Sequence, residues 1–265
     1  MLMPVPLAYR KYGDSGPAVL ILHGLFGQSD NWTSIAKTLS EHGFQVYTLD
    51  SRNHGLSPHT IEWSYETMAD DLSHFIKNHA LTNPLCIGHS MGGKTLLYYE
   101  SLFSGTLRGL VIVDIAARNY PPHHSDVFKA LLSVDFNTHK TRKEAELVLQ
   151  NQIPEPGVRQ FLLKNLYWKD APRQELAWRF NLDVLNHHAH EIGKAVPEFY
   201  SNTPAGLIYG THSSYINSED LADFKKRFTN FTLYPIKNSG HWVHAEQPQA
   251  FVKAFIDFTN TLVGY

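Results

Sequence analysis

The stretch Gly88-His89-Ser90-Met91-Gly92-Gly93 decides the fold of this chain, because it places a serine between glycines where an apolar run gives way to a helical pattern. Residues 84–87 (Pro-Leu-Cys-Ile) have the pattern of a buried strand, and residues 94–99 continue with the spacing of a buried helix. The three glycines lack the side chains that would clash when the chain reverses so sharply. The stretch therefore predicts a nucleophile elbow that presents the Ser90 hydroxyl, rather than a glycine turn that contains a serine without a role.

Length and composition limit the possible classes of protein. The chain has 265 residues, of which 43% are hydrophobic, so it can bury one large core and is expected to form a single domain. A net charge of -2 without a long basic run argues against a nucleic-acid surface. The N-terminal sequence lacks the pattern of a secretory signal, and no uninterrupted apolar run reaches about 18 residues, so we expect a cytoplasmic protein. The single cysteine, Cys86, is expected to be a buried thiol.

Short apolar runs alternate with helical patterns along most of the chain. The expected parallel strands cover residues 19–22, 45–49, 85–87, 110–113, 206–209 and 230–236. The expected helices lie near residues 31–42, 65–79, 91–103, 217–228 and 246–262. This alternation predicts an α/β fold with a mostly parallel, doubly wound sheet, whose site lies at the carboxyl ends of the strands.

The region from about 116 to 203 interrupts this alternation. It carries helical patterns, several prolines and no convincing strand, which predicts a helical cap inserted between two strands of the sheet. Aromatic side chains of the cap could form an apolar roof over Ser90, but for most of them we favour a place in the core of the cap itself. These residues are Phe128, Phe136, Phe161, Tyr167, Trp168, Trp178 and Phe180.

A serine nucleophile needs a base within hydrogen-bond reach, because its hydroxyl is weakly nucleophilic at neutral pH. His241 follows the last predicted strand in a loop with Gly240, just before the terminal helix. We therefore predict that His241 is the base. His244 is the rival, but it should already lie at the start of the terminal helix.

The run His23-Gly24-Leu25-Phe26-Gly27 follows the first predicted strand and resembles a loop that supplies an oxyanion donor. We expect the backbone N–H groups of Leu25 and Met91 to hold the negative oxygen of a tetrahedral intermediate. The candidate residues of the substrate pocket are His23, Phe26, His89 and Trp242. Residues 50–57 (Asp-Ser-Arg-Asn-His-Gly-Leu-Ser) are interpreted as a loop held by hydrogen bonds of its aspartate and arginine.

Several histidines could be mistaken for metal ligands. The histidines near 123–124, 187–190 and 241–244 match neither His-Glu-x-x-His nor a cysteine-rich site. The first strand also leads into His23-Gly24, and not into the glycine pattern of a dinucleotide site. We therefore expect no metal and no cofactor.

Four motifs taken together resemble the α/β-hydrolase family, and more narrowly the YbfF-type bacterial esterases: residues 23–27, 50–57, 88–94 and 240–246. The similarity spans nearly the whole chain, and the ordered set is more specific than any one motif. It implies a cytoplasmic carboxylesterase or thioesterase with a small helical cap. The serine at position 90 argues against dehalogenases and epoxide hydrolases, which resemble this fold but use an aspartate nucleophile.

The acid that would orient the base is the least obvious member of the site. In α/β-hydrolases it commonly follows the strand before the last one, but residues 211–215 contain no carboxylate, and Ser213 falls at that position. We favour Asp114, at the end of the strand that follows the elbow helix, and the resemblance to the YbfF-type subgroup implies the same position. The fallback candidates are Glu219 and Asp220.

Three interpretations of function follow. The first is an esterase for short or medium acyl groups that works through an acyl-enzyme and has Ser90, His241 and Asp114 as catalytic residues. The second is an acyl-CoA thioesterase, which would need basic residues near the mouth of the cap to meet phosphates, such as Arg118, Lys129 or Lys169. The third is a ligand-sensing protein that has kept the fold, which the complete catalytic set disfavours. The expected partner is a small-molecule ester or thioester, without nucleic acid, and the chain is expected to be a monomer or a weak homodimer.

Overall fold

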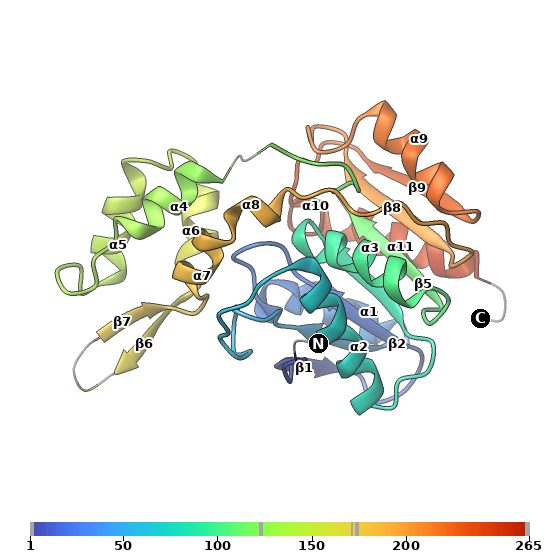
Figure 1. The fold of residues 1–265 in the computed structure, drawn as a ribbon, viewed down its shortest axis with the longest axis horizontal. Helices are drawn as coiled ribbons and strands as arrows, with labels where there is room; N and C mark the ends of the chain where they lie inside the picture. Colours follow the sequence, from blue (N-terminus) through green and yellow to red (C-terminus); the bar gives the residue numbers. More distant parts are fainter. Residues whose placement is uncertain (1–2, 122–123, 171, 173–174, 263–265) are drawn as a thin grey trace.

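The computed structural model describes residues 3–121, 124–170, 172 and 175–262. A seven-stranded sheet lies at the centre (Figure 1). Its strands are β1 (Tyr9–Tyr12), β2 (Ala18–Leu22), β3 (Gln45–Leu49), β4 (Leu85–His89), β5 (Gly109–Val113), β8 (Ala205–Gly210) and β9 (Phe231–Ile236). The order is β1-β3-β2-β4-β5-β8-β9, with β1 antiparallel to β3 and all other neighbours parallel. The predicted fold class is confirmed.

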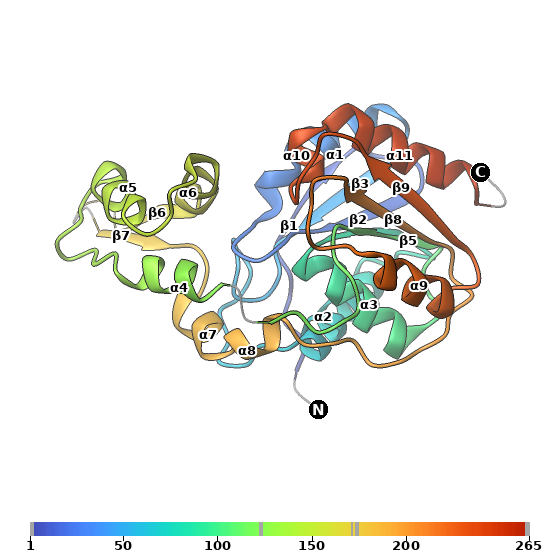
Figure 2. The ribbon, with the colours of Figure 1, turned by 90° about the horizontal axis from the view of Figure 1, so that it is seen from above.

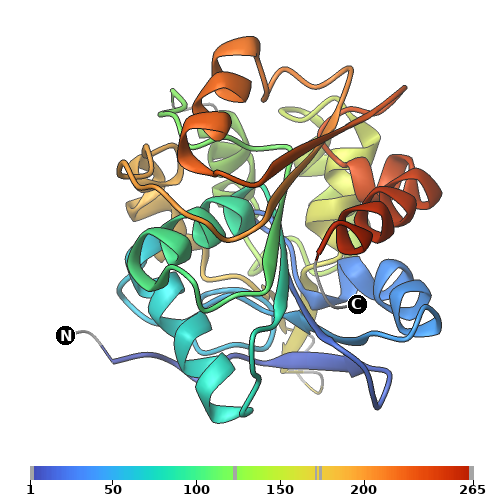
Figure 3. The same cartoon turned by 90° about the vertical axis from the view of Figure 1, so that its right-hand side faces the viewer.

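Helices cover both faces of the sheet (Figure 3). One face carries α1 (Thr33–Glu41) and α11 (Pro248–Asn260), and the other carries α2 (Tyr65–Asn78), α3 (Met91–Phe103) and α9 (Ser218–Arg227). In β2, Val19 and Ile21 pack toward α1 and α11, whereas Leu20 and Leu22 pack toward the opposite helices. Burial on both faces explains why the central strands are continuous apolar runs.

Outside the segment between β5 and β8, the predicted elements need three corrections. Strand β1 was missed, because its sequence Tyr-Arg-Lys-Tyr is largely exposed at the edge of the sheet. The helix predicted at 31–42 begins with a 3-10 turn, η1 (Ser29–Trp32), before α1. The helix predicted at 246–262 is divided into α10 (Val243–Glu246) and α11, because Pro248 starts a new helix at its first turn.

The segment between β5 and β8 lies to one side of the sheet (Figures 1 and 2). Its helices are α4 (Ser125–Leu132), α5 (Arg142–Gln150), α6 (Pro156–Leu163), α7 (Leu182–His187) and α8 (Ala189–Ile192). The prediction that it contains no strand was wrong, because β6 (Leu166–Asp170) pairs antiparallel with β7 (Glu175–Trp178). Most of their side chains are only partly buried, so no apolar run marks these strands. We call this segment the cap, and its standing as part of a single domain stays a prediction.

A buried lysine joins the two chain segments that connect the cap to the sheet. Lys94, on α3, donates hydrogen bonds to the carbonyl oxygens of Arg118 (3.0 Å), Gly193 (2.9 Å) and Lys194. Arg118 lies on the connection into the cap, and the other two residues lie on the connection out of it. Burial, assisted by the charge of Arg118, lowers the pKa of Lys94 to about 7.

Candidate active site

Ser90 stands at the corner between β4 and α3. Its backbone has φ 52° and ψ -115°, a strained combination for a residue with a side chain. A Cβ atom at Gly88 would lie 2.4 Å from the Gly92 oxygen, and one at Gly92 would lie 2.5 Å from the Leu22 oxygen. The glycines on both sides of Ser90 are therefore required by this corner, and they leave the serine at the carboxyl end of a central strand.

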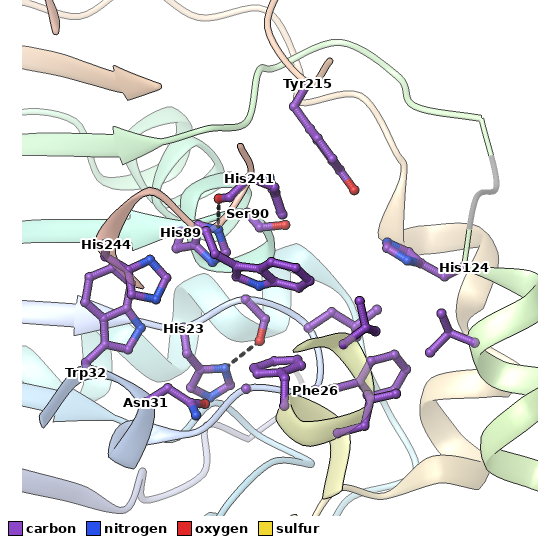
Figure 4. Close-up of a pocket in the computed structure, with 18 residues that line it drawn as sticks. His23, Phe26, Asn31, Trp32, His89, Ser90, His124, Tyr215, His241 and His244 are labelled. Carbon is purple, nitrogen blue, oxygen red and sulfur yellow. Dashed lines mark hydrogen bonds between the residues drawn. The ribbon is translucent and has the colours of Figure 1, made fainter. Parts of the chain in front are cut away.

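His241 and Asp114 form a close pair across 127 residues of sequence. The Nδ1 atom of His241 lies 2.7 Å from Oδ2 of Asp114, whose side chain is fully buried. The backbone N–H of Gly210 donates to the other carboxylate oxygen at 3.1 Å. His241 and Ser90 line the same pocket (Figure 4). The structure thus brings together the three residues that the sequence selected as nucleophile, base and acid.

Ser213 is the second side-chain partner of this carboxylate, although it was noted above only as the residue at the usual position of the acid. Its hydroxyl donates to Oδ2 of Asp114 at 2.5 Å and accepts the backbone N–H of Tyr215 at 3.2 Å. The ring of Tyr215 stacks on His241, with centroids 3.9 Å apart and planes at 16°. Residues 211–215 therefore contact both members of the His241–Asp114 pair: Ser213 donates to the carboxylate and Tyr215 packs on the imidazole ring.

The other candidate acids serve elsewhere. Asp220 forms an ion pair with Arg118 at 3.1 Å and accepts the N–H of Asn217 at the start of α9. Glu219 is exposed in the first turn of the same helix. Neither carboxylate is among the partners of His241 within the described part of the chain.

His244 lines the pocket but differs from His241 in its surroundings. It lies in α10, is buried, and stacks on Trp32 with centroids 3.9 Å apart. Burial, with a smaller contribution from His241, lowers its pKa to about 3. Its Nδ1 atom has no hydrogen-bond partner among the described residues. His244 is therefore held neutral and lacks a carboxylate that could orient it as a base.

The loop that carries His241 is fixed through its backbone. Glu246 accepts the N–H groups of Gly240 at 2.7 Å and Trp242 at 3.2 Å. On the other side, Nε2 of His89 donates to the carbonyl oxygen of His241 at 2.9 Å. Burial, followed by the neighbouring His241, holds the pKa of His89 well below its usual value. These contacts hold His241 in place independently of the pair with Asp114.

The loop after β2 contains the first predicted oxyanion donor. Leu25 lies beside Phe26, whose φ of 59° is in the left-handed region. The N–H of Phe26 donates to Nε2 of His54 at 3.2 Å. In the described part of the chain, the N–H groups of Leu25 and Met91 have no hydrogen-bond acceptor. Neither N–H group is therefore committed to another acceptor within these residues, and their role as oxyanion donors stays a prediction.

His54 was not selected from the sequence. Its Nδ1 donates to the Arg52 carbonyl oxygen at 3.0 Å, which leaves Nε2 as the acceptor for Phe26. Burial, with smaller effects from neighbouring histidines, lowers the pKa of His54 to about 3, so this arrangement persists at neutral pH. The rest of residues 50–57 agrees with the prediction: Asp50 accepts the N–H of Leu56 at 2.9 Å, and Arg52 binds Asp71 at 2.6 Å.

The pocket above Ser90 has a volume of about 330 Å³ and a mostly apolar wall (Figure 4). The four predicted pocket residues, His23, Phe26, His89 and Trp242, all line it. The pocket also contains residues that were not predicted: Asn31, Trp32, His124, Val127, Val158, Leu162 and Tyr215. Those from 124 to 162 come from the cap and its first connection, whose position relative to the sheet has no local signal in the sequence, and Tyr215 comes from the loop after β8.

Most cap aromatics do not reach this pocket. Phe161 lines it, 6.0 Å from the ring of Trp242, whereas the ring of Trp178 stacks on Phe180 inside the cap. Phe128 is also buried in the core and packs against Phe26. This agrees with the preference for a structural role for most of these side chains.

The described residues contain no group of three or more His, Cys, Asp or Glu side chains that could hold a metal ion. His123, considered above as a ligand, lies outside these residues. Among the helices that the structure describes, none is both long and apolar enough to span a membrane.

Comparison with known proteins gives concordant matches over nearly the full chain. Residues 17–248 match the family model of the alpha/beta hydrolase fold. The sn-1-specific diacylglycerol lipase ABHD11 of Mus musculus is 35% identical over 269 residues, which cover 97% of this chain and 86% of the relative. Esterase YbfF of Escherichia coli is 34% identical over 251 residues, which cover 93% of this chain and 94% of the relative. Among solved structures, a marine microorganism esterase has a TM-score of 0.92 and 38% sequence identity. The match covers 96% of this chain and 99% of the esterase.

Proposed function

The chain belongs to the alpha/beta hydrolase family, and we propose that it is a serine carboxylesterase that hydrolyses short- to medium-chain acyl esters through an acyl-enzyme. Family membership and the esterase relatives make it an ester-hydrolysing enzyme, and they confirm the resemblance that the four motifs indicated. The mechanism and the class of ester are the proposal. The observation that carries it is the 2.7 Å pair of His241 and buried Asp114 in the pocket of Ser90.

In the proposed first half-reaction, Ser90 Oγ attacks the ester carbonyl carbon while His241 Nε2 takes the hydroxyl proton. The carbonyl oxygen becomes an oxyanion, held by the N–H groups of Leu25 and Met91. His241 then returns the proton to the leaving alcohol as the C–O bond breaks, which leaves the acyl group on Ser90. Asp114 stays ionised and stabilises the imidazolium through Nδ1–H.

In the second half-reaction, His241 takes a proton from a water molecule that attacks the acyl-enzyme carbonyl carbon. The Ser90–acyl bond breaks, His241 returns the proton to Ser90 Oγ, and the carboxylic acid leaves. The cycle consumes only ester and water, so it needs no cofactor.

The character of the pocket favours an ester over an acyl-CoA thioester. Its apolar wall suits hydrocarbon, and no lysine or arginine is among the described residues that line it. Arg118, one of the cationic residues considered above for phosphate binding, forms an ion pair with Asp220 instead. Lys129 and Lys169 are exposed on the cap and outside the pocket. A phosphate-bearing carrier would therefore find no charge-assisted contact at this wall. We keep a small-molecule ester, a cytoplasmic location and a monomer or weak homodimer as the accompanying predictions.

Hydrolysis of p-nitrophenyl esters from acetate to palmitate tests the proposal, with acyl-CoA thioesters measured in parallel. Ser90→Ala and His241→Ala should each lower kcat by at least about 10³-fold while near- and far-UV circular dichroism stay unchanged. A wild-type chain that hydrolyses no ester, or a Ser90→Ala variant with wild-type activity, would refute the serine mechanism. Faster thioester turnover would instead select the thioesterase.

A further inference from the structure

Two cavities of very different size meet at Ser90. The large pocket described above, of about 330 Å³, contains His241 and Trp242 in its wall. A second, small pocket has a volume of about 10 Å³, roughly the least space that holds one water molecule. Four residues line both pockets: Leu25, Ser90, His124 and Tyr215. The side chains that line only the small pocket belong to Tyr65, Met91, Ile115, Tyr120 and Ile192.

The chemistry of ester cleavage assigns the two halves of the substrate to these cavities. The leaving oxygen must lie next to His241, which protonates it, so the alcohol extends into the cavity whose wall contains His241. The acyl chain is bonded to the same tetrahedral carbon and extends from it in another direction. Met91, the second proposed oxyanion donor, lines only the small pocket, and His241 is not among the residues that line this pocket.

We propose that this enzyme selects esters of a short acyl group, acetyl above all, with a large apolar alcohol, because the small pocket receives the acyl chain and the large pocket receives the alcohol. This inference rests on the proposed serine-esterase function. It narrows that function by placing the longer chain on the alcohol side of the ester bond.

The walls of the small pocket are tied by buried hydrogen bonds, so they cannot easily yield to a longer acyl chain. The Tyr65 hydroxyl donates to the Ile192 carbonyl oxygen at 2.7 Å. The Tyr120 hydroxyl donates to the Tyr215 carbonyl oxygen at 2.7 Å and accepts the N–H of Ala116 at 2.9 Å. Enlarging the cavity would break such bonds and leave buried polar groups without partners.

Lys94 adds a further restraint next to the small pocket. Its three hydrogen bonds hold Arg118, Gly193 and Lys194, which adjoin the segments that supply Tyr120 and Ile192. Its ammonium group also lies 5.0 Å from the centre of the Tyr120 ring. The small pocket is therefore built into the connections of the cap.

The large pocket has a different construction. Val158, Phe161 and Leu162 of α6 and Val127 of α4 form its cap side. These are apolar side chains that can change rotamer without losing a hydrogen bond. Longer alcohols gain apolar burial in this pocket, whereas longer acyl chains meet a fixed wall.

Two ester series with opposite expected trends test the proposal. The first keeps p-nitrophenol as the alcohol and changes the acyl group from acetate to butyrate to octanoate. The second keeps acetate and changes the alcohol from ethanol to butanol to octanol, with acetate release as the readout. All esters stay below their solubility limits, and Ser90→Ala gives the background rate.

We expect kcat/KM to fall at least tenfold from acetate to octanoate in the first series. In the second series it should rise with alcohol length, by up to about fourfold for each methylene group that is buried. Octanoate turnover equal to or faster than acetate turnover would overturn the inference while leaving the esterase function intact. Absence of hydrolysis above the Ser90→Ala background in both series would instead refute the proposed function.

A matched pair of truncations locates the selectivity. Of the two pockets at Ser90, Ile192→Ala enlarges only the small one. It keeps the backbone carbonyl that accepts the Tyr65 hydroxyl, so it should raise the butyrate-to-acetate ratio of kcat/KM at least fivefold. Val158→Ala enlarges only the large pocket, so it should lower the octyl-to-ethyl acetate ratio and leave the butyrate-to-acetate ratio unchanged. The reverse pattern would contradict the assignment. If Ile192→Ala does not fold, Ile115→Val makes a smaller enlargement of the same pocket.

Discussion

The sheet side and the cap side of the large pocket differ in chemistry. The loops of the sheet contribute groups that can bond to an ester or exchange protons with it, namely Ser90, His241 and the backbone around Leu25. The cap helices α4 and α6 contribute Val127, Val158, Phe161 and Leu162, which can only exclude water and shape an apolar space. One region is suited to the reaction, and the other to the choice of substrate.

The two regions are also held together differently. Asp114 accepts hydrogen bonds from three sources, the Gly210 N–H, the Ser213 hydroxyl and His241, in a fully buried site. On the cap side, Asn165 donates to the Phe26 carbonyl oxygen at 2.8 Å, and the N–H of Asn181 donates to the Asn53 carbonyl oxygen at 2.9 Å. The catalytic groups are fixed by short hydrogen bonds at strand ends, whereas the pocket wall that α4 and α6 contribute consists of apolar side chains held by packing.

The largest effect is expected from Asp114→Asn on the sheet side. An amide oxygen can accept from His241 only if the NH₂ group faces the Gly210 N–H, where two donors meet. In the opposite orientation the NH₂ group donates to Nδ1 of His241, which leaves the proton on Nε2 and prevents this atom from acting as the base. We expect kcat to fall by about 10³- to 10⁴-fold with little change in KM, measured on a p-nitrophenyl ester. Ser213→Ala, which removes one donor and keeps the carboxylate, should cost only about tenfold. Equal losses in both variants would contradict the role of Asp114 as the ionised partner of His241.

The next effect is expected from His54→Ala, which removes the acceptor of the Phe26 N–H. The loop should then hold Leu25 less accurately, and kcat should fall by about 10²-fold while KM changes little. His54→Gln, whose amide oxygen can accept the same N–H, should recover part of the loss. His42→Ala, on the exposed end of α1, is the matched control. A lower Tm with unchanged kcat would make His54 purely structural.

A smaller, pH-dependent effect is expected at the junction of the two regions. The pKa of Lys94 is about 7 in the folded chain, against about 10.4 when unfolded, so the unfolded chain binds more protons between these values. Its contribution to stability therefore increases as pH rises through this range. We expect urea unfolding to show that the wild type gains on the order of 2 kcal/mol relative to Lys94→Met between pH 7 and 9. A difference independent of pH would contradict the lowered pKa.

The smallest effect is expected on the outer surface of the cap. Leu147 in α5 is 55% exposed, so Leu147→Ala should change the free energy of unfolding by less than about 0.5 kcal/mol. Its kcat/KM should stay within about twofold of the wild type. Leu149→Ala, at a buried position in the same helix, is the positive control for cap destabilisation. A strong loss of activity in Leu147→Ala would show that the cap surface takes part in substrate capture.

Much of the sheet was predictable because its signals are local. Central strands buried on both faces are apolar runs, and the elbow needs glycines at fixed positions next to Ser90. The exposed edge strand β1 and the β6–β7 hairpin have no such pattern, since their side chains face water on at least one side. The apolar-run criterion therefore failed where burial is incomplete.

The catalytic residues that come directly after a strand in the sequence could be predicted. His241 and Asp114 were selected because each comes directly after a strand or its turn, although their 2.7 Å contact spans 127 residues. Ser213 and His54 act on other groups through hydrogen bonds, and nothing in their own sequence neighbourhood specifies those partners. Such residues are found only when the strand order has placed their loops together.

The α/β class, the elbow around Ser90 and the loop of His241 follow from local sequence, because glycine sterics and apolar spacing act within a few residues. The contact between Asp114 and His241, the support that His54 gives to the loop of Leu25, and the division of the space around Ser90 into a large and a small pocket arise only in the folded chain. Those distances join segments far apart in the chain, so they depend on the order of the strands and on where the cap packs.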